Sequence, residues 1–422
     1  MRTCALFVLM LLGATAGGTP AAAQVPRPMS LADVVAAAVD RNPAVLAASQ
    51  VVRSAEASVA LARAGRGPTV SASGGASQAG GTATSAGFSS SIGVAASYVV
   101  YDSNQTALAV RQAEANLRAA RLALDAARQD VAQTAALAYV AVLRAERAVV
   151  QREQAVVQNR ELLRLAEGQF AAGVVPRADV VRAQATLTAA EGELIAARNA
   201  ADQSRAQLNA ALGSPPLAPI AVAAAPAVPL VTVSAAALAE LVEQRPDVRR
   251  AQADLEAAEA GLALAQAGNG LRVSLSGSVS QGITPSTNTT YTVGGTVSLP
   301  LADAGRVQAQ VEAASAAVAA ARARLAAARL TAQQQAVAAL LAVGNARARI
   351  ASARAGLAFA QESLRLAQGR YAAGAGSILE VVDAQTALVA AEVTLASAEF
   401  DEVAGVIALR YALGRSVVDG AI

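Results

Sequence analysis

One stretch of sequence occurs twice in this chain, and the two copies lie 201 residues apart. The first copy starts at Arg164 and reads RLAEGQFAAG, and the second starts at Arg365 and reads RLAQGRYAAG. The same register continues to Gly213 and Gly414. Ala-rich helices align easily by chance, but chance does not place Gly, aromatic, Gln and Glu residues in one common register. A repeat of this length predicts that one structural unit is built twice in tandem.

The composition excludes most kinds of catalytic site. The chain has no His, its single Cys is Cys4 near the N-terminus, and all 34 basic residues are Arg. A mature chain without Cys, His and Lys cannot use thiolate, imidazole or Schiff-base chemistry, and it cannot form a His/Cys zinc site. The net charge of +3 comes from interleaved acidic and basic residues, which argues against nucleic-acid binding. We expect no enzyme activity, no cofactor and no metal.

The N-terminus predicts export from the cytoplasm. Residues 1–23 contain Arg2, an apolar run and the small residues Ala21 to Ala23, which is the pattern of a secretory signal peptide. No later run of about 18 apolar residues follows, so we expect no transmembrane helix. The chain is nevertheless 54% hydrophobic with a mean hydropathy of +0.40. Much of this is Ala, which suits closely packed helices.

Each copy contains two segments in which apolar residues alternate with Ser, Thr or Gly, the pattern of a β-hairpin. No charged residue interrupts 69–101 or 273–302, whereas exposed strands of soluble sheets usually carry charges that oppose edge pairing. This favours tilted strands that cross a bilayer over a soluble hairpin with one wet face, which is the alternative. The expected strands are about 69–79, 88–101, 271–281 and 290–301.

Four strands cannot span a membrane alone, because the backbone groups at their two edges would face hydrocarbon unpaired. Strands from several chains must therefore close into a common barrel. This reasoning implies an oligomer and leaves its number open.

Long helices follow each hairpin, because no Pro occurs between Pro68 and Pro176 or after Pro300. Small and larger residues at 4-3 spacing predict a coiled-coil seam along these helices; in the first copy it contains Ala113, Leu117, Ala120, Leu124, Ala127, Val131, Thr134 and Ala138. Repeat one is expected at 24–213 (long helix about 103–171, tip 172–176, return helix 177–212). After a Pro-rich linker at 214–230, repeat two is expected at 231–414 (long helix about 303–373, tip 374–377, return helix 378–413), with a tail at 415–422.

Residues 30–414 resemble the TolC family of outer-membrane efflux proteins. The motifs that carry the resemblance are AVDRNP ending at Pro43, AGVVPRADVVRAQ ending at Gln184, and AGAGSILEVVDAQ ending at Gln385. The resemblance implies a homotrimer whose three chains share one twelve-stranded barrel in outer-membrane lipid. It also implies that the helices continue as a periplasmic tunnel and that the tips meet a periplasmic adaptor of an inner-membrane pump or secretion system.

The resemblance also implies roles for residues near the tips. Glu380 and Asp383 match acidic residues that ring the tunnel aperture in the family; the alternative is that they favour the helix dipole in a first turn. Asp179 and Tyr371 match a contact between neighbouring hairpins that acts as a latch. The alternative is that Tyr371 packs against its own helix pair and Asp179 caps a helix.

The turns match the small-Gly-small tip that contacts the adaptor in the family, although a bare helical hairpin has the same composition. One position departs from a well-known example of the family, because Gly376 stands where that example has an Arg that forms a salt bridge in the closed state. Arg177 and Arg182 are candidate replacements, and a closed state with fewer contacts is the other option. The six tip residues are Ala172, Gly173, Val174, Ala373, Gly374 and Ala375.

The predicted function is therefore a passive exit duct of a tripartite efflux pump, carrying drugs or other small molecules from the adaptor to the exterior. One alternative is the outer-membrane component of a type I protein secretion system. A second alternative, of a different class, is a periplasmic coiled-coil scaffold that forms no channel.

Overall fold

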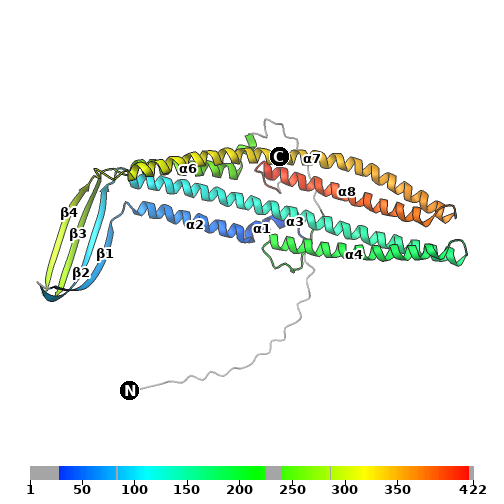
Figure 1. Ribbon diagram of the computed structural model, residues 1–422, viewed down its shortest axis with the longest axis horizontal. Helices are drawn as coiled ribbons and strands as arrows, with labels where there is room; N and C mark the ends of the chain where they lie inside the picture. Colours follow the sequence, from blue (N-terminus) through cyan, green and yellow to red (C-terminus); the bar gives the residue numbers. More distant parts are fainter. Residues whose placement is uncertain (1–27, 82–83, 225–239, 286, 418–422) are drawn as a thin grey trace, which may run out of the picture.

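The computed structural model describes residues 28–81, 84–224, 240–285 and 287–417. The predicted signal peptide at 1–23 lies outside these residues, as do parts of the predicted linker and tail. The molecule is long and mostly helical, with a four-stranded sheet at one end and two helical hairpin tips at the other (Figure 1). The long helices and the four strands per chain are as predicted, and the closure of a barrel between chains stays a prediction.

The two repeats have the same order of elements, as the repeated sequence predicts. Repeat one contains α1 (Leu31–Arg41), α2 (Pro43–Ala64), β1 (Thr69–Gly81), β2 (Thr84–Tyr101), α3 (Gln105–Ala171) and α4 (Arg177–Ala211). Repeat two contains α6 (Pro246–Gln266), β3 (Arg272–Thr284), β4 (Asn288–Ser298), α7 (Arg306–Ala372) and α8 (Ile378–Ala412). α3 and α7 have 67 residues each, so each is about 100 Å long.

In both repeats an Asp residue lies at the connection between the second strand and the long helix. A carboxylate oxygen of Asp102 accepts a hydrogen bond from the backbone N–H of Thr106 at 2.8 Å, and that of Asp303 accepts from Val307 at 3.0 Å. The two residues after each Asp have positive φ angles, which redirect the chain. The carboxylates satisfy N–H groups that a helix start otherwise leaves without partners.

The residues just before α2 and α6 contact the ends of the return helices α4 and α8 in equivalent ways. The Asn42 side chain donates to the carbonyl of Ala211 at 2.9 Å, and the Arg245 side chain donates to the carbonyl of Ala412 at 3.2 Å. Ala211 and Ala412 are equivalent positions of the repeat. Each repeat is therefore closed on itself near the middle of the molecule.

The four strands form one antiparallel sheet in the order β1-β2-β3-β4. The inner pair β2 and β3 joins the repeats, with Tyr98 opposite Leu275. The sheet is placed by the helices, because α3 and α6, which flank β2 and β3 in the sequence, pack side by side.

The helices form a layer in which α3 is central: α3 packs between α2 and α6 near the sheet and between α4 and α8 near the tips (Figure 1). This position alters the predicted seam. Ala135, Ala136 and Tyr139 are buried in α3, whereas Thr134 of the predicted seam is exposed. The 4-3 pattern assumes a single partner, whereas α3 has a neighbour on each side, so residues outside the predicted seam are buried as well. In α7 the equivalent seam residues Val318, Ala321, Leu325, Ala332 and Ala339 are buried, and Gln335, the counterpart of Thr134, is exposed as Thr134 is.

Among the described helices, none combines the length and the apolar character needed to cross a membrane.

Candidate functional site

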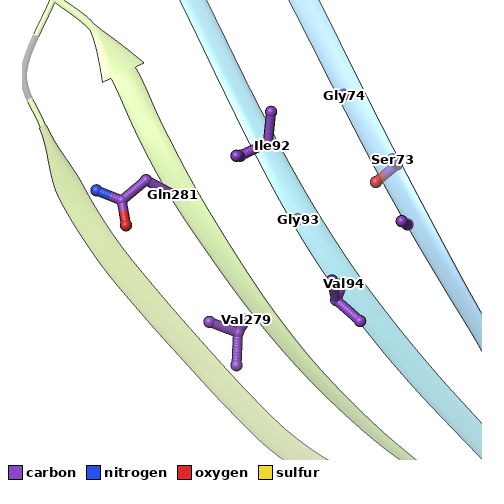
Figure 2. Close-up of a pocket in the computed structure, with 8 residues that line it drawn as sticks. Ser73, Gly74, Ile92, Gly93, Val94, Val279 and Gln281 are labelled. Atoms are coloured by element: carbon purple, nitrogen blue, oxygen red, sulfur yellow. The ribbon is translucent and has the colours of Figure 1, made fainter.

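The sheet separates its side chains into two chemically different faces. Val94 pairs with Ala72 on β1 and with Val279 on β3, so these residues share one face. Figure 2 shows part of this face, where Ile92 and Val94 of β2 lie beside Val279 and Gln281 of β3 around a shallow hollow. The opposite face carries hydroxyl groups, from Ser71, Ser73, Ser91, Ser97, Ser276, Ser278, Thr290, Thr292 and Thr296.

None of the residues that the structure describes covers the apolar face of the sheet. Tyr291 and Val293 of β4 are 81% and 79% exposed, and Ile92, Val94 and Leu275 are at least half exposed. An apolar surface of this extent marks contact with another protein or with lipid. One uncharged apolar face opposite a polar face is the pattern of strands in a membrane barrel, where the polar face lines the interior.

The chain has two open edges that run from the sheet to the tips. Within the described residues, β1 and β4 are outer strands that pair on one side only. In the helical part of the molecule, α2 and α4 continue the edge that begins at β1, and α7 continues the edge that begins at β4 (Figure 1). Both edges carry exposed apolar side chains, which on the first edge include Leu61, Val181 and Ile195. On α7 they recur at whole-turn spacings opposite the buried side of the helix, at Leu330, Val337, Leu341, Phe359 and Leu366.

The hairpin tips have the geometry that the Gly residues predict. Gly173 and Gly374 have φ angles of 73° and 70°, which Gly adopts without steric cost. A methyl group added at Gly374 would lie 3.9 Å from Cγ1 of Val174, so the two tips lie side by side. The predicted tip residues of both turns are exposed: Ala172, Gly173, Val174, Ala373, Gly374 and Ala375.

The structure brings Tyr371 and Asp179 close together. Burial raises the pKa of the Tyr371 hydroxyl, and the nearby Asp179 carboxylate raises it further. The hydroxyl is buried, and within the described structure it makes no hydrogen bond of ordinary geometry. The Tyr371 ring also packs in the core of its own hairpin with Ile378 and Val381, as the alternative interpretation states. Asp179 does not cap α4, whose start has no side-chain cap hydrogen bond.

Glu380 and Asp383 lie three residues apart at the start of α8, so they share a face. Glu380 is not free: its Oε2 lies 3.0 Å from Nη1 of Arg370, the third residue from the end of α7. Asp383 is exposed and forms no ion pair in the part of the chain that the structure describes. No cluster of three metal-ligating side chains occurs among the described residues.

Comparison with known proteins identifies the family. The sequence pattern of the outer membrane efflux proteins matches residues 34–214 and 237–415, which is most of both repeats.

This chain belongs to the outer membrane efflux protein family.

Members of the family are transport channels and not enzymes, so the chain is an outer-membrane efflux channel. Its fold is similar to that of the outer membrane protein VceC from Vibrio cholerae, with a TM-score of 0.80 and 22% identity over 92% of this chain and 96% of that one. It is also similar to the open state of the outer membrane channel MtrE from Neisseria gonorrhoeae, with a TM-score of 0.77 and 22% identity over 92% and 89% of the two chains.

One relative matches over a smaller part of its length. Nodulation protein T of Rhizobium leguminosarum bv. trifolii is 26% identical over 295 residues, which span 68% of this chain and 63% of that protein. This chain therefore spans less than two thirds of the length of that protein.

The departure from the family pattern at Gly376 has a local explanation. A Cβ atom at this position would lie 3.0 Å from Cβ of Arg370, so the Arg370 backbone leaves little room for a larger residue. Arg177 and Arg182, the candidate replacements, are exposed and form no ion pair in the described structure. Arg370 was not among the residues predicted to be functional. A comparison of the repeats singles it out, because the counterpart of Arg370 in the first copy is the uncharged Gln169.

Proposed function

We propose that this efflux protein is the outer-membrane exit duct of a tripartite pump, formed by three copies that join edge to edge. The observation that supports this assembly most is the pair of open edges, one along β1, α2 and α4 and the other along β4 and α7. Each edge combines an unpaired strand with exposed apolar helix residues, so a chain that stands alone leaves both uncovered.

Edge-to-edge pairing satisfies both edges at once. Because the strands alternate in direction, β4 of one copy runs antiparallel to β1 of the next. Contact between two different edges closes into a ring when the rotation per copy is right, and a closed barrel leaves no backbone group unpaired in hydrocarbon. The resemblance to the TolC family sets the number of copies at three, and four strands from each give a barrel of twelve.

In this arrangement the apolar face of the sheet contacts outer-membrane lipid and the Ser/Thr face lines the pore. Arg272 lies on this face at the first position of β3, and the rest of the pore wall in this section carries no charge, because 69–101 and 273–302 contain no charged residue. A neutral hydroxyl wall conducts solutes without binding them tightly, which suits a passive duct for drugs and other small molecules.

The exposed tips at 172–174 and 373–375 are the proposed contacts of a periplasmic adaptor, through which the duct reaches an inner-membrane pump. Their small side chains leave backbone accessible to a partner. Photo-crosslinking from Val174 and Ala375 in cells, followed by identification of the captured protein, tests this contact. Capture of no periplasmic adaptor at either tip would contradict it.

The aperture is proposed to be held by the Tyr371 hydroxyl and the Asp179 carboxylate. Tyr371→Phe removes the hydroxyl and keeps the buried ring, which is 1% exposed. If a charge-assisted hydrogen bond of about 1.5–3 kcal/mol forms in the closed assembly, the variant raises the population of the open state by about tenfold or more. We expect single-channel current in planar bilayers to rise for Tyr371→Phe and for Asp179→Asn.

Tyr139→Phe is the matched control, since Tyr139 is equally buried but far from the tips, where its hydroxyl donates to the carbonyl of Ala223. Its current should equal that of the unmodified protein. Equal currents for all the variants would reject the latch. A purified trimer that gives no conductance steps at all would reject the duct itself.

A further inference from the structure

The charges at the second tip are arranged differently from those at the first. In the second copy, Arg370 lies in the last turn of α7, and Glu380 and Asp383 lie in the first two turns of α8. The equivalent positions of the first copy hold Gln169, Asp179 and Arg182. The first tip therefore has the uncharged Gln169 at the position of Arg370. The Asp179 carboxylate of this tip lies beside the Tyr371 hydroxyl.

Arg370 is held across the turn between α7 and α8. Its Nη1 lies 3.0 Å from Oε2 of Glu380, and its Nη2 donates to the carbonyl of Ala375 at 3.5 Å. Gly376, with no side chain, passes directly beneath the Arg370 side chain. The guanidinium group thus lies next to Glu380, one of the two carboxylates that the resemblance to the TolC family implies at the aperture.

From this geometry we propose that Arg370 neutralises Glu380 within each hairpin, so that Asp383 is the carboxylate that sets the charge selectivity of the duct entrance. The inference rests on the proposed function, because it assumes that the tips surround the aperture. A closely paired Arg and Glu have almost no net field beyond about one Debye length, whereas an isolated carboxylate attracts cations over that distance. The three α7–α8 hairpins of a trimer then present three uncompensated Asp383 charges in place of six from Glu380 and Asp383 together.

Arg370 is accordingly a specificity-determining residue. It is 60% exposed in its side chain and Glu380 is 41% exposed. Exposed pairs of this kind contribute little to folding, so variants at either position should assemble normally. Their effect is expected on permeating ions.

The test is the reversal potential of purified trimers in planar bilayers under a potassium chloride gradient, which gives the ratio of potassium to chloride permeability. Arg370→Gln frees Glu380 and should raise this ratio by about threefold, the effect of three added charges acting through water at about one Debye length. Asp383→Asn should lower the ratio by a similar factor. The double variant Arg370→Gln with Glu380→Gln should return it to the value of the unmodified protein.

Arg365→Gln is the matched control. Arg365 lies five residues earlier on α7, is similarly exposed and pairs with Glu362 at 2.6 Å, but it lies further from the turn. An unchanged ratio in this variant beside the shift in Arg370→Gln supports the inference. An unchanged ratio in Arg370→Gln, or in Asp383→Asn, overturns it while leaving the duct intact. Absence of current in the unmodified trimer would instead reject the duct together with this inference.

Discussion

Replacing Leu341 by Asp is expected to convert the assembled duct into single chains. Leu341 lies in the exposed stripe of α7, is 61% exposed in the chain and is expected to be buried by the next copy. Burial of a Leu side chain stabilises by about 1.5–3 kcal/mol, and burial of an unpaired carboxylate costs more than this gain. Every trimer contains three such contacts, so the loss at each is multiplied. Size-exclusion chromatography in detergent should show monomers at concentrations where the unmodified protein is trimeric.

Val157→Asp is the control for this prediction. Val157 is 58% exposed, almost the same as Leu341, but it lies on α3, which has neighbouring helices on both sides within the chain. Its exposed side therefore faces out of the layer and not toward another copy. Val157→Asp should remain trimeric. If Leu341→Asp is as trimeric as Val157→Asp, the α7 stripe is not an interface.

The second large effect is expected at Arg245, which is 3% exposed where α6 begins. Its guanidinium donates to the Asp247 carboxylate at 2.7 Å, to Oε1 of Gln335 at 2.9 Å and to the Ala412 carbonyl at 3.2 Å. It also lies 5.5 Å from the centre of the Tyr411 ring. One side chain thus connects α6, α7 and α8.

Arg245→Leu removes these contacts and leaves their partners without a donor. We expect the free energy of unfolding to fall by about 3 kcal/mol, with the full penalty for a lone buried charge avoided because Asp247 is 46% exposed. Loss of helical circular dichroism with urea measures this change. Arg249→Leu, an exposed Arg on the same helix without an ion pair in the described residues, should change stability by less than about 0.5 kcal/mol. Equal destabilisation of both variants would contradict the role of Arg245.

The repeat and the strand alternation were enough to predict the order of helices and strands in the chain, because both can be read directly from the sequence. The alternating Ser and Thr residues of β3 and β4 predict one polar face, and the paired strands have one. The strand ends were less visible: β2 begins at Thr84, in a Ser-, Ala- and Gly-rich stretch without clear alternation. The joining of β2 to β3 depends on α3 packing against α6, which no local pattern encodes.

The candidate site likewise contains features that the sequence predicts and features that depend on packing. The positive φ angles of Gly173 and Gly374 follow from the residue type, and the sequence predicted those turns. The pair between Arg370 and Glu380 crosses a turn, so it depends on how the turn closes and not on a helical spacing. The buried contacts of Arg245 join residues up to 167 positions apart, and such contacts follow only from the packing of whole helices.

Disulfide bonds between the outer strands of different copies test the central claim most directly. Paired antiparallel strands bring facing Cα atoms to about 4.5–5.5 Å, which a disulfide can bridge, and the chain has no Cys after Cys4. Cysteines placed in turn at Ser71 or Ser73 on β1, each with one at Thr290 or Thr292 on β4, sample neighbouring registers of the contact. Oxidation in outer membranes should give covalent dimers and trimers, and no larger species, for at least one pair, and none when the β1 cysteine is combined with one at Ser276 on β3. Monomers alone from all four β1–β4 pairs would contradict a wall shared between copies.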